Sequence, residues 1–341
     1  MPTVFLYEYV CAVAADVDAS SEASMSAAAL TLRHEGETMR ASLALDWQRL
    51  GWNVVLLDAD PADPTPEAIR FRALARQCDR TLIIAPEFGD LLGERIRWAQ
   101  AEGVQPINAS LDAIALTSDK LRLADWLESR QIPTPKTVMI ADAERIRFPQ
   151  VWKPRDGAGS QATHAVPDAR AIPATHAKIA ADSWTGPMIA TEFWPGVPAS
   201  IAFLTGPNGM VPLCPTRQQL SDDGRFLYQG GELPLPPEWA ARAERIARRA
   251  LESLPGLRGY IGVDLVLGSA TDGRADAIIE INPRLSTSYG GLRLATPVNL
   301  AEWMLHLADG GHPPTTPLPW RTTPLRFDIA TLAQARHQFR R

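Results

Sequence analysis

Strand and helix signals alternate through the first hundred residues of the chain. Met39, Leu43 and Trp47 recur at helical spacing, and a second such stripe follows at residues 92–99. Short apolar runs typical of strands occur at residues 4–10, 54–57, 81–85 and 106–107. Strands that alternate with helices form parallel sheets, because each crossover helix returns the chain to the same edge. The pattern therefore predicts an α/β fold that begins with a βαβ parallel-sheet domain at residues 1–112.

Two segments of this domain allow more than one interpretation. Residues 16–29 are rich in Ala, Ser and Asp, which favours a flexible insertion over an early helical turn. Residues 1–15 are as apolar as a signal peptide, but they have no basic region and they contain Glu8. We therefore interpret them as the first strand.

The remaining chain is predicted to form two α+β lobes and an extended tail. Ser118 is expected to cap a helix that runs to about Arg130. A small sheet-based lobe at residues 113–186 is expected from strands at 137–140, 150–153 and 163–166. A second lobe at residues 187–310 is expected from a helix at 238–254 and strands at 188–193, 200–204, 261–267 and 277–281. Residues 311–341 are expected to form a proline-rich wrap and a short basic tail.

Charge and cysteine content restrict the possible partners. The formal net charge of −5 argues against a nucleic-acid-binding face, which needs a basic excess, so small molecules are the expected partners. Cys11, Cys78 and Cys214 are widely separated and lack a nearby histidine, which predicts reduced cysteines in a cytoplasmic protein. No stretch approaches the roughly 18 to 20 continuous apolar residues of a membrane span. No membrane association is therefore expected.

The strongest chemical signal lies where an apolar strand ends in polar residues. Glu280 and Asn282 are two positions apart on this strand, so their side chains point to one face. Asp264, on a neighbouring strand, would add a third oxygen donor, and three such donors suit Mg²⁺ or Mn²⁺ with phosphate oxygens completing the coordination. The alternative is that these are ordinary polar residues at a sheet edge. Arg284 follows directly, and its planar guanidinium can bind a carboxylate or a phosphoryl oxygen through two parallel hydrogen bonds.

A glycine-rich segment follows a lysine at the end of another predicted strand. Residues 157–162 match the dinucleotide pattern GxGxxG/A, but a strand follows them where that pattern requires a helix. They therefore predict a hairpin loop, whose backbone N–H groups can cover phosphates beside the charge of Lys153. A purely structural hairpin is an equal alternative. No GxxxxGK[ST] sequence is present, which excludes a P-loop protein by motif.

A third segment places an acid and two aromatic residues at the end of an apolar strand. Glu192, Phe193 and Trp194 can form a hinge that binds a nucleotide base through backbone groups while the side chains flank it. Taken alone, such a segment is more often part of a core.

Together these segments resemble the ATP-grasp superfamily, in the family's order, from about Ser118 to Thr296. The resemblance implies an N-terminal domain followed by two lobes that clamp ATP, with Asp264, Glu280 and Asn282 as metal ligands. It implies that ATP is bound by the following residues: Lys120, Lys153, Gly157, Ala158, Gly159, Ser160, Glu192, Phe193 and Trp194. Two positions depart from familiar members. Pro198 stands where many carry an acid that contacts ribose, and Gly262 stands where dipeptide ligases carry an arginine, which leaves Arg284 to stabilise an acyl phosphate.

Other segments are similar to the tyramine–glutamate ligases of methanofuran biosynthesis. They are Phe5-Leu6-Tyr7-Glu8-Tyr9, His34-Glu35-Gly36-Glu37-Thr38-Met39, Ala85-Pro86-Glu87-Phe88, Arg217-Gln218-Gln219, Tyr228-Gln229-Gly230-Gly231 and Arg284-Leu285-Ser286-Thr287-Ser288-Tyr289. The similarity implies an ADP-forming ligase that joins L-glutamate to an aromatic amine, tyramine or tyrosine, through an acyl phosphate. The product would serve a methanofuran-type carrier in one-carbon metabolism. Arg284 and Lys153 are then the expected catalytic residues.

Substrate contacts are expected from Arg284 and from polar residues in these same segments. The further candidates are Arg217, Gln218, Gln229, Ser286, Thr287 and Ser288, and the three hydroxyls are equally well explained as ordinary loop residues. A homodimer is expected by analogy with the superfamily. Three alternatives stay open: a ligase for another amino acid and amine, an ATP-grasp phosphotransferase, and a nucleotide-binding regulator without catalysis.

Overall fold

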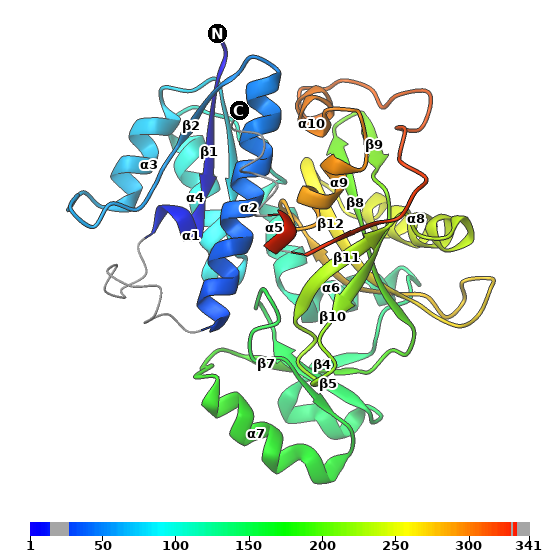
Figure 1. Ribbon diagram of the computed structural model, residues 1–341. Helices are drawn as coiled ribbons and strands as arrows, with labels where there is room; N and C mark the ends of the chain where they lie inside the picture. Colours follow the sequence, from blue (N-terminus) through cyan, green and yellow to red (C-terminus); the bar gives the residue numbers. More distant parts are fainter. Residues whose placement is uncertain (14–26, 329, 333–341) are drawn as a thin grey trace.

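A computed structural model describes residues 1–13, 27–328 and 330–332 of the chain. The predicted loop at residues 16–29 lies outside these residues except for 27–29, which are helical. Most of the predicted basic tail, from residue 333 onward, also lies outside them. The described residues form three parts: an N-terminal domain, a small lobe that carries α7 and a large lobe around β8 and β12 (Figure 1).

The N-terminal domain contains a parallel sheet, as the sequence predicts, and its strand order is β2-β1-β3. Its strands are β1 (Thr3–Glu8), β2 (Asn53–Leu56) and β3 (Arg80–Ile84). Its helices are α1 (Tyr9–Ala12), α2 (Ala27–Arg49), α3 (Glu67–Ala75) and α4 (Leu91–Ala101), with a short 3₁₀ helix, η2 (Phe88–Asp90), before α4. The strand expected at residues 106–107 is reduced to a single parallel bridge between Thr81 and Pro106.

Helix α2 lies between the N-terminal sheet and the large lobe (Figure 1). The predicted stripe of Met39, Leu43 and Trp47 is buried, which confirms the helical spacing. The opposite side of α2 is polar and includes Arg33 and His34. Across the part of the chain that the structure describes, no helix is both long and apolar enough to cross a membrane.

Two consecutive helices, α5 (Leu111–Ser118) and α6 (Lys120–Ser129), lead from the N-terminal domain into the small lobe. The prediction that Ser118 caps the second helix is wrong by one residue. Asp119 is the cap, and its carboxylate accepts a hydrogen bond from the Arg122 N–H. Ser118 instead ends α5, and its hydroxyl donates to the Ile114 carbonyl at 2.6 Å. Ser and Asp are about equally good caps, so only the preceding helix decides between them.

The small lobe is built on an antiparallel sheet with the order β4-β7-β5-β6. Its elements are β4 (Thr137–Met139), η3 (Ile140–Arg145), β5 (Gln150–Pro154), β6 (His164–Val166), η4 (Ala169–Ala171), α7 (Ile172–Ala181) and β7 (Met188–Glu192). Strand β7 was assigned to the second lobe from the sequence, but it pairs with β4 and β5. Pairing with strands about 40 to 50 residues earlier leaves no signal in the local pattern.

The large lobe carries a mainly antiparallel sheet with the order β13-β12-β8-β10-β11-β14, and β9 pairs with β8. Its strands are β8 (Val197–Gly206), β9 (Gly209–Pro212), β10 (Thr216–Leu220), β11 (Tyr228–Leu233), β12 (Gly259–Leu267), β13 (Ala277–Asn282) and β14 (Leu325–Phe327). Its helices are α8 (Pro237–Glu252), α9 (Tyr289–Leu294) and α10 (Leu300–Ala308). Residues 311–324 form neither a helix nor a strand and lead to β14 at the sheet edge.

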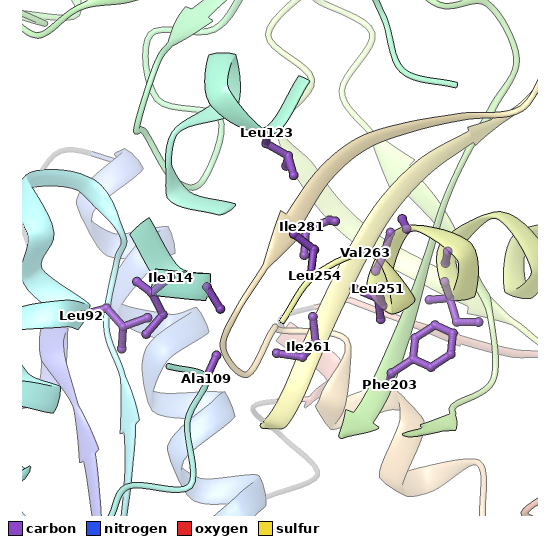
Figure 2. Packing of buried hydrophobic residues seen from close by; sticks show 14 of the residues in the cluster. Leu92, Ala109, Ile114, Leu123, Phe203, Leu251, Leu254, Ile261, Val263 and Ile281 are labelled. Carbon is purple, nitrogen blue, oxygen red and sulfur yellow. The ribbon is translucent and has the colours of Figure 1, made fainter. Parts of the chain in front are cut away.

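A continuous apolar core joins the N-terminal domain to the large lobe. Leu92 and Ile114 contribute from α4 and α5, whereas Ile261, Val263 and Ile281 contribute from β12 and β13 (Figure 2). All five side chains are buried. Close packing of this kind resists displacement, so the edge of β12 and β13 is held in a fixed position against the N-terminal domain.

Candidate active site

The predicted metal ligands meet where β12 and β13 pair. Asp264 lies opposite Glu280 in this antiparallel pair, and Gly262 lies opposite Asn282. The Asn282 amide donates from Nδ2 to Asp264 Oδ2 at 3.0 Å. Gln218 of β10 donates to the other oxygen of the Asp264 carboxylate at 2.8 Å. The sheet register therefore brings two carboxylates and an amide together and fixes the central carboxylate from two sides.

The electrostatics of these groups favour a bound cation. Burial and, to a smaller extent, the charge of the nearby Glu280 together raise the pKa of Asp264 to about 7. Burial also acts to raise the pKa of Glu280, but Lys120 and Lys153 outweigh it and the pKa is lowered. A divalent cation would relieve the repulsion between the two carboxylates, and oxygen donors are those that Mg²⁺ prefers. The described residues contain no group of three His, Cys, Asp or Glu side chains suited to a metal, so the fit depends on the Asn282 oxygen as a third donor.

Both predicted phosphate-binding lysines face the same carboxylates. Lys120, at the first turn of α6, is buried and its Nζ lies 3.4 Å from Glu280 Oε1. Nζ also donates to the Gly157 carbonyl at 2.5 Å. Burial lowers the pKa of Lys153, and the charge of Lys120 lowers it further, while Glu280 and Asp264 act in the opposite direction. Two lysines close to two carboxylates form a region that can bind an anion and a cation together.

The glycine-rich segment is a loop between β5 and β6, as predicted. A Cβ atom on Gly157 would lie 2.6 Å from Pro154 Cβ, so the close approach requires glycine. Gly159 and Ser160 both have positive φ, at 63° and 58°. The Ser160 hydroxyl donates to the Phe226 carbonyl at 2.9 Å, which joins the loop to the turn between β10 and β11. The loop thus contacts Lys120 through Gly157 and is held to the large lobe through Ser160.

The predicted hinge residues have three different roles. The Glu192 carboxylate accepts a hydrogen bond from the Arg147 N–H at 3.1 Å. The Trp194 indole donates to the Ala275 carbonyl at 2.7 Å and so joins the hinge to the large lobe. Phe193 is 41% exposed, and its ring stacks against Phe226 with centroids 6.3 Å apart. The exposed ring of Phe193 is the part of the hinge that is suited to a base.

Arg284 lies in the segment that follows β13 and faces the N-terminal domain. Its Nε atom lies 2.9 Å from Glu87 Oε1, and both side chains are largely buried. Burial acts to lower the pKa of Arg284, but Glu87, Glu280 and Glu35 outweigh it and the pKa is raised. The guanidinium is therefore a permanent cation that three carboxylates surround.

The three hydroxyl residues after Arg284 divide into two groups. Ser286 and Ser288 hydrogen-bond to each other at 2.9 Å and to the Tyr260 hydroxyl at 2.9 and 3.2 Å. Thr287 instead interacts with the Glu35 carboxylate of α2. The structure therefore directs Thr287 toward the N-terminal domain and uses the serines to hold the segment against β12.

The candidates on β10 and β11 lie on opposite faces of the sheet. Gln218 reaches Asp264, whereas its neighbour Arg217 is exposed and belongs to the other face by strand alternation. Gln229 is likewise exposed, next to the half-buried Tyr228. Burial is the main cause that raises the pKa of the Tyr228 phenol, and the charges of Asp264 and Glu35 also raise it.

Sequence reasoning assigned no role to Glu35, Glu87 or Tyr228, although the structure directs them toward the site. All three stand in segments that carry the resemblance: His34 to Met39, Ala85 to Phe88 and Tyr228 to Gly231. Their presence in those segments was the available signal. No pattern in the sequence indicates that residues so far apart along the chain lie close together in the fold.

Two hollows of the surface lie away from these residues. One has a volume of 230 Å³ and is lined by residues between 124 and 137. The other has a volume of 870 Å³ and is lined by residues that include Asn108, Arg258 and Asp309. Neither is lined by a predicted metal ligand or phosphate-binding lysine. The candidate site is therefore defined by converging charged side chains.

Family models match most of the chain. The model described as ATP-grasp domain matches residues 117–288, which include the lysines, the loop and the predicted metal ligands. The model described as pre ATP-grasp 3 domain matches residues 38–114. The chain belongs to the ATP-grasp family.

Individual relatives are similar at low identity. Tyramine–L-glutamate ligase from Methanocaldococcus fervens is 25% identical over 235 residues, which are 68% of this chain and 66% of that protein, just under two thirds of its length. A crystal structure of an ATP-grasp superfamily protein from Archaeoglobus fulgidus has a TM-score of 0.65 at 22% identity, covering 96% of this chain and 99% of that one. Carboxyaminoimidazole ribonucleotide synthase from Aspergillus clavatus, complexed with ATP, has a TM-score of 0.69 at 15% identity over 95% of this chain and 80% of that one. The two structures support the fold.

Proposed function

We propose that the protein is an ATP-dependent ligase that joins a carboxylate of L-glutamate to an aromatic amine, with release of ADP and phosphate. The observation that carries the proposal is the convergence of Lys120 and Lys153 on Asp264 and Glu280. Arg284 stands beside them, as a third cation. Phosphoryl transfer depends mainly on positioning and on charge stabilisation, which these residues can supply.

A carboxylate does not react with an amine at a useful rate, so it must first be activated. ATP can supply the activation by transferring its γ-phosphoryl group to the carboxylate, which gives an acyl phosphate. Lys120 and Lys153 would hold the phosphate oxygens, and Gly157 and its neighbours would cover them and exclude water. Arg284 would stabilise the charge of the acyl phosphate. The amine nitrogen then forms the C–N bond as the C–O bond to phosphate breaks.

Asp264, Glu280 and Asn282 would hold Mg²⁺ or Mn²⁺ in this scheme. The metal, when bound, supplies positive charge to the transferring phosphoryl group. Gln218 and Asn282 hold the Asp264 carboxylate in place by hydrogen bonds from either side. Asn282 would thus bind the metal and, together with Gln218, orient the Asp264 carboxylate.

The choice of substrates rests on the relative named tyramine–L-glutamate ligase and on the shared segments. We infer glutamate as the acid and tyramine, or tyrosine, as the amine. Thr287 and Gln218 are the best-placed of the candidate substrate contacts, because the side chains of Arg217 and Gln229 are exposed. We propose further that the enzyme is cytoplasmic and acts in the synthesis of a methanofuran-type carrier.

The test is a screen for ADP release with L-glutamate and a set of amines, coupled to mass detection of the amide. A ligase should release phosphate only when both acid and amine are present. A phosphotransferase would leave a stable phosphorylated product, and a regulator without catalysis would show no turnover. If glutamate were silent with every aromatic amine while another pair reacted, the substrate assignment would fall and the reaction class would stand.

A further inference from the structure

The N-terminal domain contributes two carboxylates to the side of Arg284 that faces away from the sheet. Glu87 follows β3 and lies 2.9 Å from the Arg284 guanidinium. Glu35 lies in α2 and interacts with both Arg284 and Thr287. Because β3 and α2 belong to one domain while Arg284 and Thr287 belong to the other, the cluster exists only at their junction.

Several polar atoms in this cluster are buried without a hydrogen bond. Among the described residues, Glu87 Oε1, Arg284 Nε and the Tyr228 hydroxyl have no hydrogen-bond partner. The close approach of Glu87 to Arg284 is therefore an ion pair without the directional geometry of a hydrogen bond. Buried polar groups are nearly always paired, so the Tyr228 hydroxyl, which has no partner among the described residues, indicates a missing polar partner close to Glu35.

The charges of the cluster indicate the sign of that partner. Among the described residues, Glu35 and Glu87 both interact with Arg284, whereas the two lysines of the site interact with Asp264 and Glu280. Burial raises the pKa of Glu35 to about 7, although Arg284 and Thr287 act in the opposite direction. When both carboxylates are ionised, the cluster holds two negative charges beside one guanidinium, and a positively charged ligand would favour that ionised form.

We propose that Glu35 and Glu87 form the binding site for the ammonium group of the amine acceptor, with Tyr228 and Thr287 beside it. This inference rests on the proposed function, in which Arg284 contacts the acyl phosphate. The nitrogen that attacks must arrive next to the acyl carbon, and Glu35 and Glu87 are carboxylates beside Arg284 that are not predicted metal ligands. A carboxylate pair binds an ammonium group through charge-assisted hydrogen bonds.

The experiment compares Glu35→Gln, Glu35→Asp and the control Glu37→Gln in the full chain. Glu37 lies two residues along α2, and its carboxylate pairs with Arg33 at 3.1 Å. We expect Glu35→Gln to raise the KM for tyramine by about 10- to 100-fold, with the KM values for glutamate and ATP changed by less than about twofold. Glu35→Asp should recover part of the loss, and Glu37→Gln should behave as the wild type. Thermal unfolding checks that each variant is folded.

Direct binding separates this inference from the proposed reaction. Titration of tyramine into the protein saturated with a non-hydrolysable ATP analogue and glutamate should give weaker binding in Glu35→Gln whether or not turnover occurs. Wild-type turnover with an unchanged tyramine KM in Glu35→Gln would overturn the ammonium site and leave the proposed function intact. A rise in the glutamate KM alone would also overturn it, because the carboxylates would then hold the donor. If the wild type neither turned over nor bound tyramine, both proposals would fail.

Discussion

Lys120 and Glu280 lie 3.4 Å apart, Nζ to Oε1, and connect the start of α6 to the end of β13. The same Nζ donates to the Gly157 carbonyl, so one side chain joins the glycine-rich loop to a predicted metal ligand. Phosphate binding and metal binding would therefore be coupled through Lys120. Its replacement should affect both.

Replacement of Lys120 by Met should weaken ATP binding, because it removes a buried positive charge that the phosphates would contact. We expect the KM for ATP to rise by about 10- to 100-fold. Lys178→Met is a matched control, since Lys178 is an exposed lysine of α7. Steady-state kinetics of ADP release measure both variants. Equal ATP KM values in Lys120→Met and Lys178→Met would contradict the role of Lys120.

Removal of divalent metal should abolish turnover, and so should loss of a ligand. We expect EDTA to stop ADP release and added Mg²⁺ or Mn²⁺ to restore it. Asp264→Asn should lower kcat by about 100-fold or more, since it removes one of two carboxylates that would face the metal. Asp272→Asn, an exposed acid between β12 and β13, is the control. Full activity in the presence of EDTA would rule out the metal site.

The close approach of the predicted metal ligands could be inferred because their signal is local. Residues two apart on a strand share a face, so Glu280 and Asn282 could be placed together from the sequence alone. Asp264 required only the assumption that the two strands are neighbours, and they pair directly. The glycine-rich hairpin was predictable for the same reason, since strand signals flank it closely on both sides.

Features that depend on distant pairing were not predictable. Glu35, Glu87 and Arg284 meet across about 250 residues of sequence, and no periodicity relates α2 to the segment after β13. Strand β7 was placed in the wrong lobe because its partners lie in β4 and β5. Local propensity predicts the type of an element better than it predicts its neighbour.

Replacement of Gly157 by Ala should disturb the loop more than the same change at Gly159. A Cβ on Gly157 would lie 2.6 Å from Pro154 Cβ, which forces a shift, whereas at Gly159 the nearest atom is the Leu32 side chain at 4.0 Å. Gly159→Ala would strain only the backbone, where φ is 63°, at about 1–2 kcal/mol. We expect the ATP KM to rise more in Gly157→Ala. The opposite order in a kinetic comparison would contradict this account of the loop.

Replacement of Asp46 by Asn should destabilise the junction between α2 and the large lobe. The Asp46 carboxylate binds the Arg293 guanidinium and accepts a hydrogen bond from the Tyr289 hydroxyl at 2.8 Å, and Asp46 and Arg293 are both buried. Loss of one charge of a buried pair costs about 3–5 kcal/mol. Urea unfolding should therefore show a lower midpoint than for the wild type. The exposed Asp60 is the control, and Asp60→Asn should leave the midpoint unchanged.

Replacement of Glu35 by Gln should stabilise the ligand-free protein at high pH and not at low pH. Burial raises the pKa of Glu35 from its ordinary value of 4.5 to about 7 in the folded state. Between pH 4.5 and 7 the folded chain therefore holds a proton on Glu35 that the unfolded chain has released, so this group lowers the stability as the pH rises. A glutamine cannot ionise and avoids that loss, which amounts to at most about 3.4 kcal/mol, because each pKa unit corresponds to about 1.36 kcal/mol. The unfolding measurement must therefore resolve a stability difference of this size between Glu35→Gln and the wild type.

Urea unfolding of Glu35→Gln and the wild type at pH 5 and pH 8 measures this effect. The variant's stability relative to the wild type should be greater at pH 8 than at pH 5, and Glu37→Gln should show no such change. If tyramine binds at Glu35 as an ammonium ion, its addition at pH 8 should make the wild type more stable than Glu35→Gln. The wild type then gains binding free energy that the variant lacks. A relative stability that does not depend on pH would show that Glu35 is not held in the partly buried setting on which the ammonium site depends.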